Sequence, residues 1–324
     1  MSAPLISIVI PCFNNGRLLA GTLSCLRAQS LPEDRFEVLI VDDGSTDDTA
    51  GVVKRLELPM NLHYFKHANR GAAAARNFGA TQSQAKLILF LDSDVSAEPG
   101  LLQEHLACHN RNSRALVVGR TRPMILSQPD SFWRIMAEDL YGFDFGEQEQ
   151  EIEFRHLISR NLSLTKASFM EVGGFDETFP KSGFEDTEFA YRAAKQGYRV
   201  IYSPSAAGVH QHHGTLRQTG EHFYSYQISA ALLMQRQPAM KGMLPHLRDK
   251  EPIQLGQDDL RLLLRKLARR ALSASVLNKG LPPIVRACEN HYPAPSLLRF
   301  LYWQVLGSYM YLGYRDGIRR YRLQ

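Results

Sequence analysis

Cysteine is scarce in this sequence, and its spacing excludes two classes of small protein. The 324 residues contain four cysteines with no C-x-x-C pair among them: Cys12, Cys25, Cys108 and Cys288. Zinc knuckles need closely spaced cysteine pairs, and disulfide-stabilised domains need many cysteines in a short chain. We therefore expect neither kind of site. The scattered thiols fit a protein of a reducing compartment.

Long apolar runs are also missing, and we expect no secretory leader. No window reaches roughly 18 uninterrupted apolar residues, which a membrane-spanning helix would need. The N-terminal segment MSAPLISIVIP has no basic stretch before its apolar residues, as a signal peptide would. We therefore predict a cytoplasmic protein without a transmembrane helix.

Glycine-rich phosphate loops are absent as well. The first predicted turn between a strand and a helix reads P-C-F-N-N-G, which matches neither G-x-G-x-x-G nor the Walker pattern. These motifs bring backbone N–H groups against phosphates in dinucleotide-binding and P-loop enzymes. Both classes are therefore disfavoured, although a nucleotide could still be held by stacking its base and by a metal on its diphosphate.

The segment KLILFLDSDV, residues 86–95, organises the rest of the chain. Its apolar run predicts a strand buried on both faces, and Asp92 and Asp94 follow at its carboxyl end. Alternate residues of a strand point to the same side, so these two carboxylates should lie together. A divalent cation that also contacts a diphosphate would relieve their repulsion. The alternative is a turn whose aspartates only cap the next segment.

The first half of the chain alternates strands and helices. Apolar patterns predict strands at 5–11, 36–41, 62–66 and 86–91 and helices at 17–29, 46–57 and 72–84, with a capping box formed by Ser45 and Asp48. Such alternation predicts a Rossmann-like α/β fold with a mostly parallel sheet. The carboxyl ends of parallel strands meet at one edge. We expect Phe13, Asp42, Asp43, Asp92 and Asp94 to converge there.

The following segment is less regular. Strands are predicted at 116–119, 157–165 and 198–202, and a helix at 184–196. Residues 128–157 fit either a mobile flap or acceptor loop, or an ordinary surface insertion. Three acids begin the helix, Glu185, Asp186 and Glu188; they could serve chemistry or simply complement the helix dipole.

The C-terminal region differs from the rest of the chain in its predicted helical content and in its charge. We divide the chain into a domain at 1–215, with halves at 1–120 and 121–215, and a basic helical region at 216–324. Helices are predicted at 224–237, 260–277 and 296–321, separated by proline-bearing stretches near 238–257 and 281–295. Residues 241–324 carry 15 Lys/Arg against 6 Asp/Glu. These basic, aromatic-bearing helices fit peripheral contact with the cytoplasmic face of a membrane, or a helical cap with a solvated basic face.

Six motifs occur in order between about Ile6 and His213: SIVIPCFNN, VLIVDDGSTDDT, NRGAAAARNFGA, LFLDSDV, GGFDE and FEDTEFAYRAAKQGYRV. Each is weak alone, but together the chain resembles the family 2 glycosyltransferases. The resemblance implies the GT-A nucleotide-sugar-binding fold, here with a C-terminal helical extension. It covers some two thirds of the chain and gives no information on residues 220–324.

The resemblance also implies roles for individual residues. The donor nucleotide would be bound by residues of the first strands and turns: Pro11, Phe13, Asn14, Asp42, Asp43, Arg76, Asp92 and Ser93. Asp94 would hold Mn²⁺ or Mg²⁺, helped by Asp92 and by His210, with His212 as a substitute for His210. The catalytic base would be Asp186, and the acceptor would be bordered by Gly174, Phe175, Asp176 and Glu185.

The implied reaction is an inverting transfer of a sugar from a UDP-, GDP- or dTDP-linked donor to a glycan or a lipid-linked acceptor. Asp186 would take the proton of the acceptor hydroxyl, and its place at a helix start predicts a low pKa. Family members of this layout build cell-surface polysaccharide or lipopolysaccharide, and no nucleic-acid partner is expected. A nucleotidyltransferase and an inactive sugar-binding scaffold are the alternatives.

Overall fold

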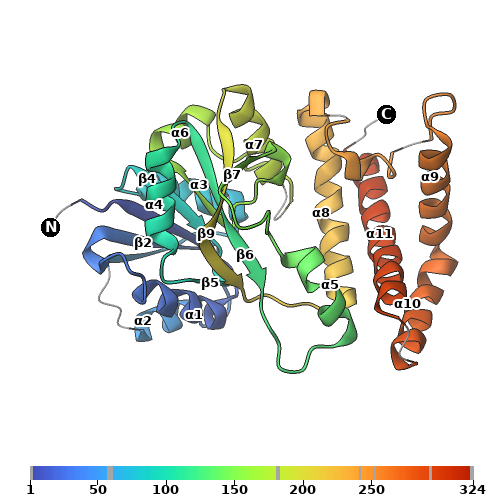
Figure 1. Cartoon of the computed structure of the whole chain (residues 1–324), viewed down its shortest axis with the longest axis horizontal. Coiled ribbons are helices and arrows are strands. Elements are labelled where there is room, and N and C mark those ends of the chain that lie inside the picture. Colours follow the sequence, from blue (N-terminus) through green and yellow to red (C-terminus); the bar gives the residue numbers. More distant parts are fainter. Residues whose placement is uncertain are drawn as a thin grey trace. The chain divides into compact units, whose positions relative to one another are not determined.

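We describe the protein from a computed structural model, which covers residues 3–56, 61–179, 183–240, 242–251, 253–291 and 294–321. Figure 1 shows its elements. The described residues form two compact units. Unit 1 consists of Met1–Ile125, Tyr141–Lys181 and Glu185–His212, and unit 2 of Leu126–Leu140, Ser182–Phe184 and His213–Gln324. The division after His212 lies close to our predicted boundary, but the sequence did not indicate that residues 126–140 belong with the C-terminal helices.

The N-terminal half of unit 1 has the predicted alternation of strands and helices. Strands β1 (Ile6–Cys12), β2 (Phe36–Asp42), β3 (Asn61–Lys66) and β4 (Leu87–Leu91) are parallel and lie in the order β3-β2-β1-β4. Helices α1 (Gly16–Arg27), α2 (Thr49–Arg55) and α3 (Ala72–Gln82) connect them. Successive residues of β4 enter two different core clusters, which confirms that this strand is buried on both faces, and β1 does the same.

The remainder of the sheet is mixed rather than mostly parallel. Strand β8 (Asn161–Thr165) is antiparallel to β4 and to β6 (Ala115–Pro123), and β6 is parallel to β9 (Arg199–His210). Strand β9 also pairs antiparallel with β5 (Val95–Ala97) and β7 (Gln150–Ile152). Among the described strands, four pairings are parallel and four antiparallel. Strand β9 runs well beyond our predicted end at 202, because its Ala- and Gly-rich second half is held by partners rather than by intrinsic propensity.

Several local predictions were wrong. Residues 128–157 are not irregular: they contain α5 (Ser131–Tyr141), β7 and a short 3₁₀ turn, Phe154–His156. Helices α4 (Leu101–Arg111) and α6 (Lys166–Val172) had not been predicted. The capping box at Ser45 does not form, since α2 begins at Thr49 and the Ser45 hydroxyl instead accepts a hydrogen bond from the Asn14 amide at 2.8 Å. Helix α7 (Glu185–Lys195) lies where it was predicted.

Unit 2 is helical. It contains α8 (Leu216–Arg236), α9 (Leu260–Ser273), α10 (Ser275–Asn290) and α11 (Pro295–Arg320), together with most of α5. Helix α8 begins eight residues before our prediction, at a capping box formed by Thr215 and Gln218. Helix α10 contains Pro282 and Pro283, where we had predicted a break. Among the described residues, no helix is long and apolar enough to cross a membrane.

Helices α8 and α11 pack closely, side by side in Figure 1. A Cβ atom on Gly313 of α11 would lie 2.1 Å from the carbonyl oxygen of Tyr224 on α8. Only glycine permits two helix backbones to approach this closely. The glycine-bearing face of α11 is therefore fixed against α8.

Candidate active site

The first two strand-end loops of unit 1 are tied together by Asn14. Its side-chain oxygen accepts hydrogen bonds from the amides of Thr46 at 2.7 Å and Asp47 at 3.3 Å. Asn14 has a φ of 50°, in the left-handed region that asparagine tolerates better than most residues. This residue, predicted to bind the donor, therefore also fixes the loop. Neighbouring Phe13 is 45% exposed, so its ring is available for stacking.

Asp42 and Asp43 are both buried, and each already accepts several hydrogen bonds. Asp42 accepts from the Ser45 amide at 2.7 Å and from the Tyr64 hydroxyl. Burial raises the pKa of Asp42, but these hydrogen bonds outweigh it, and the net pKa is lowered. Asp43 accepts from the amides of Arg70 at 2.7 Å and Gly71 at 2.8 Å. Both carboxylates thus hold the loops that would surround a nucleotide.

The turn after β4 is held from two sides. Ser93 accepts a hydrogen bond from the Asn15 side chain at 2.8 Å, which anchors the turn to the start of α1. Asp92 accepts from Arg76 Nη2 at 2.9 Å. Arg76 is 5% exposed, and its Nη1 lies 3.6 Å from Glu185 Oε1. Burial lowers the pKa of Arg76, but the charge of Asp92 and of neighbouring acids outweighs it, so its pKa is raised.

Asp94 and His210 face each other across the sheet edge. Val95 of β5 is in register with His210, the last residue of β9. The distance from Asp94 Oδ1 to His210 Nε2 is 3.4 Å. Burial raises the pKa of Asp94, but the hydrogen bond and charge of His210, together with the charges of His212 and Arg160, outweigh it, so the net pKa is lowered. The His210 ring stacks on Tyr141 at 5.8 Å, and its buried Nδ1 has no hydrogen-bond partner within the described part of the chain.

These residues fit a divalent ion with few protein ligands. Among the described residues no group of three or more candidate ligands comes together. Asp94 and His210 form a pair, whereas Asp92 is turned to Arg76. A carboxylate and an imidazole are acceptable ligands for Mn²⁺, and ions that act on phosphates often use one or two protein ligands plus phosphate oxygens. His212 lies near the pair, with its ring 5.9 Å from that of His210.

Asp186 is the second residue of α7. Its Oδ2 accepts a hydrogen bond from the Ser159 amide at 3.0 Å. Its Oδ1 is buried, and no described residue donates to it. Burial raises the pKa of Asp186 more than the charge of Arg76 lowers it. Our prediction of a low pKa was therefore wrong, because desolvation exceeds the effect of the helix start.

Arg160 is a site residue that sequence reasoning missed. It directly precedes β8; its carbonyl accepts from the Asp92 amide at 3.1 Å, and its Nη1 donates to the Tyr141 carbonyl at 3.2 Å. Burial lowers the pKa of Arg160, opposed by the charges of Asp92, Asp94 and Asp186. Antiparallel pairing of β8 with β4 brings this cation to the carboxylates. No local motif around Arg160 signals that pairing.

The predicted acceptor residues have mixed environments. Phe175 is 3% exposed and packs against Phe90 and Phe189 in the core. Gly174 has a φ of 67°, and a Cβ atom there would lie 2.9 Å from Asn77 Oδ1. Both residues are buried, and their backbones bond to side chains: the Gly174 carbonyl accepts from Arg192, and the Phe175 amide donates to Asn77. Asp176 accepts from the Thr178 amide at 2.8 Å and is half-buried.

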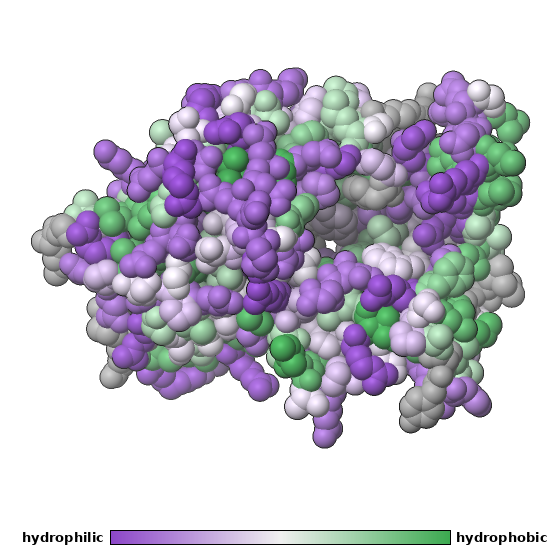
Figure 2. Space-filling model, viewed as in Figure 1, coloured by the Kyte–Doolittle hydropathy of each residue, from purple (hydrophilic) through white to green (hydrophobic). Residues whose placement is uncertain are grey.

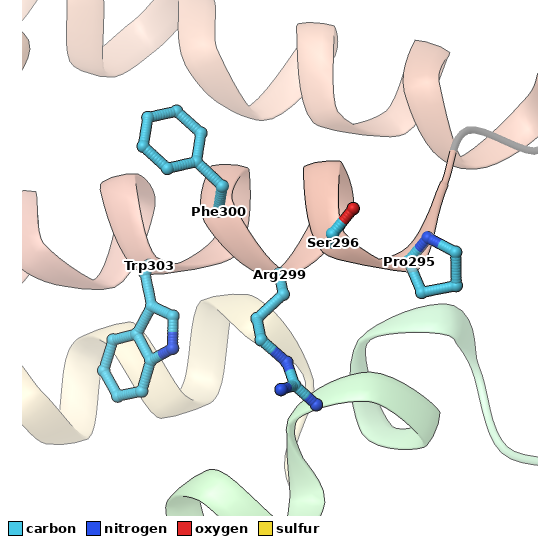
Figure 3. Close-up of a pocket in the computed structure, with 5 residues that line it drawn as sticks. All are labelled: Pro295, Ser296, Arg299, Phe300 and Trp303. Atoms are coloured by element: carbon cyan, nitrogen blue, oxygen red, sulfur yellow. The ribbon is translucent and has the colours of Figure 1, made fainter.

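A separate hollow of about 490 Å³ lies within unit 2, lined by Pro295, Ser296, Arg299, Phe300 and Trp303. Figure 3 shows that Phe300 and Trp303 leave α11 on opposite sides, so they do not form one stacking surface. Arg299 is engaged by α5: it donates to the Ile135 carbonyl at 3.2 Å and lies 3.5 Å from Asp139. The hollow therefore lacks the convergent groups found at the sheet edge of unit 1.

Comparison with known proteins identifies the family. The model of glycosyl transferase family 2 matches residues 7–173, and a model described as the N-terminal domain of galactosyltransferase matches residues 147–214. The chain is similar to validoxylamine A glucosyltransferase of Streptomyces hygroscopicus subsp. limoneus, with 33% identity over 236 residues, 65% of this chain and 52% of that protein. It is 26% identical to chondroitin synthase of Escherichia coli over 264 residues, 72% of this chain and 38% of that protein.

The chain thus spans about half, or less, of the length of these two relatives. Among solved structures, S. aureus TarS 1-349 in complex with UDP has a TM-score of 0.56 at 20% identity, covering 98% of this chain and 91% of that one. This similarity shows the fold. Because the family model covers more than half of the chain, the protein belongs to glycosyl transferase family 2.

Proposed function

We propose that the protein transfers a sugar from a nucleotide-diphosphate donor to an acceptor hydroxyl with inversion of configuration. One observation carries the proposal. Three features gather around the turn after β4: the Asp94–His210 pair, the arginines at 76 and 160, and the Asp186 carboxylate, one oxygen of which has no partner among the described residues. This set offers sites for a diphosphate and for a general base.

The donor is proposed to be UDP-, GDP- or dTDP-linked. The half-exposed ring of Phe13 supports stacking of the base. Asp42 and Asp43 lie on the neighbouring strand and hold the loops around that position. The UDP complex of TarS, which shares the fold, supports a uridine donor as the first to test.

The diphosphate is proposed to lie between Asp94 and the arginines. Asp94 and His210 would hold Mn²⁺ or Mg²⁺, which when bound offsets the negative charge that develops on the leaving diphosphate. Arg160 adds fixed positive charge beside Asp94, and Arg76 holds Asp92 in place. Cationic groups fixed in a site that excludes water stabilise such charge more than water does.

Asp186 is proposed as the general base. Its Oδ1, to which no described residue donates, would accept the proton of the acceptor hydroxyl as that oxygen attacks the anomeric carbon. The bond to the diphosphate breaks on the opposite face, which inverts the configuration. The raised pKa of Asp186 makes its carboxylate a stronger base than an exposed aspartate.

The acceptor is proposed to be a glycan or a lipid-linked glycan at the cytoplasmic face of the inner membrane. Glu185 directly precedes the proposed base in α7, and Asp176 lies in the segment between α6 and α7. The relationship to a chondroitin synthase supports a role in polysaccharide synthesis. The basic C-terminal region supports an anionic neighbour for the protein.

Donor turnover tests the proposal directly. The full chain would be incubated with Mn²⁺ and a panel of UDP-, GDP- and dTDP-sugars, with release of nucleotide diphosphate and product mass as readouts. We expect release from one nucleotide class, and loss of turnover in Asp186→Asn. Asp48→Asn makes the same chemical change at an exposed position and should behave as wild type.

Product stereochemistry tests the inversion. NMR of the purified product should show the anomeric configuration opposite to that of the donor sugar. Retention of configuration would refute the direct attack that Asp186 is proposed to assist. Failure of every donor to react with any acceptor or with water would favour an inactive sugar-binding module.

A further inference from the structure

Helix α9 exposes a leucine stripe that an ordinary surface helix would bury. Its sequence, LRLLLRKLARRALS, places leucines at positions 260, 264 and 267, which share one face of a helix. Those three leucines are 71%, 58% and 48% exposed. A helix of a globular protein normally turns this stripe toward the core.

Two of the five basic residues of α9, Lys266 and Arg269, lie on the inward face instead. Lys266 is 2% exposed, and its Nζ lies 2.8 Å from both carboxylate oxygens of Asp258. Arg269 pairs with Asp249 at 3.2 Å. These two ion pairs lie on the side opposite the leucines and hold α9 in this orientation. The outward leucine stripe is therefore imposed by contacts on the other face of the same helix.

Exposed arginines flank the leucine stripe. Arg261 and Arg265 lie along one edge, Arg270 lies along the other, and all three are exposed. The helix has no acidic residue from Leu260 to Ser273. Figure 2 shows hydrophobic residues at the outer edge of α9 with hydrophilic residues beside them. An apolar stripe between two rows of arginine matches an anionic lipid surface, where leucines enter the acyl boundary and arginines meet headgroups.

A second copy of this chain fits the same face poorly. A two-fold contact places identical patches against each other, so the flanking arginines of one copy would approach those of the other. Like charges brought together across an interface oppose association. We therefore propose that the outward face of α9, formed by Leu260, Leu264, Leu267, Arg261, Arg265 and Arg270, docks the protein on membranes that contain anionic lipid. This inference concerns unit 2 and does not depend on the transferase chemistry.

Vesicle co-sedimentation of the full chain tests the proposal. We expect binding to phosphatidylcholine vesicles that contain phosphatidylglycerol, weaker binding without it, and loss of binding at high salt. Replacing Leu260, Leu264 and Leu267 together by serine should weaken binding by roughly 100-fold or more, because each buried leucine contributes separately. Replacing the three arginines by glutamate should weaken binding to anionic vesicles on the order of 100-fold.

Leu255→Ser is the matched control, since Leu255 is 85% exposed in the same unit but lies outside α9. It should bind as wild type. Far-UV circular dichroism melts would establish that each variant is folded, and the single variant Leu264→Ser serves if the triple one is not. The proposal is overturned if the wild-type protein does not co-sediment with anionic vesicles, or if the triple leucine variant binds them as well as wild type. So does light scattering that shows a dimer which the leucine variant converts to monomer.

Discussion

Two histidines of α4, His105 and His109, should make folding stability depend on pH. His105 of α4 is fully buried; its Nε2 lies 2.9 Å from Asn161 Oδ1, and its Nδ1 lies 2.8 Å from the Ser163 hydroxyl. The amide of Asn161 donates to the Ala206 carbonyl, so its oxygen must accept from His105. The Ser163 hydroxyl then donates to Nδ1 of His105 and accepts from Nε2 of His109. The Nδ1 of His105 therefore accepts a hydrogen bond while its Nε2 donates one, which requires a neutral ring in the folded protein.

The size of the effect follows from the pKa values. Burial lowers the pKa of His105 and of His109 from 6.5 to about 4. Between pH 6.5 and 4 the unfolded chain takes up protons that the folded chain excludes, so stability is lost as the pH falls. From pH 7 to pH 5 each histidine should lower the free energy of unfolding by about 2 kcal/mol.

Urea unfolding at several pH values measures this dependence, with the far-UV circular dichroism of the β-sheet as the readout. Wild type should lose stability between pH 7 and 5, and His105→Asn should lose about 2 kcal/mol less over the same interval. NMR titration of the histidine side chains in the folded protein gives an independent reading. An ordinary histidine titration near pH 6.5 at either position, or an unchanged slope in the variant, would refute the reasoning.

Four further outcomes are expected. Asp186→Asn should lower turnover by about 10²–10⁴-fold while leaving donor binding nearly intact, measured by steady-state kinetics and calorimetry; a fully active variant would remove Asp186 from the mechanism. Asp94→Ala should abolish the Mn²⁺-dependent part of UDP binding in calorimetry, and unchanged binding would contradict its role as a metal ligand. Arg160→Ala should reduce kcat more than it raises KM, since its charge is proposed to act on the leaving diphosphate; an unchanged kcat would argue against that. Gly313→Ala should destabilise unit 2 by about 1–3 kcal/mol through its approach to Tyr224, whereas Gly280→Ala, whose Cβ would meet no described atom within 4 Å, should not.

Local patterns were sufficient for the first half of unit 1. The strands around Ile8, Val38 and Leu89 are continuous apolar runs, and the helices between them have helical apolar spacing, so each element could be read from its own residues. Because connections between parallel strands are right-handed, the carboxyl ends of these strands, and the carboxylates that follow them, were expected at one edge of the sheet. The motifs in these segments also placed the chain in its family.

The second half depended on contacts between distant residues. Nothing within the segment that contains Arg160 and Asn161 indicates that β8 pairs antiparallel with β4, yet this pairing brings Arg160 to Asp92 and Asp94. The extension of β9 to His210 likewise requires β5 and β6 as partners. Strand pairing is a long-range choice that single-sequence patterns do not record.

Burial and helix orientation were decided by the tertiary structure alone. The sequence determined that Asp186 begins a helix, but only the fold places it where desolvation raises its pKa. For α9, the sequence predicted a basic helix, and helical spacing alone places Leu260, Leu264 and Leu267 on one face. Only the ion pairs of Lys266 with Asp258 and Arg269 with Asp249 turn the leucines outward. Periodicity defines the faces of an element, whereas the environment of each face is set by the residues that pack against it.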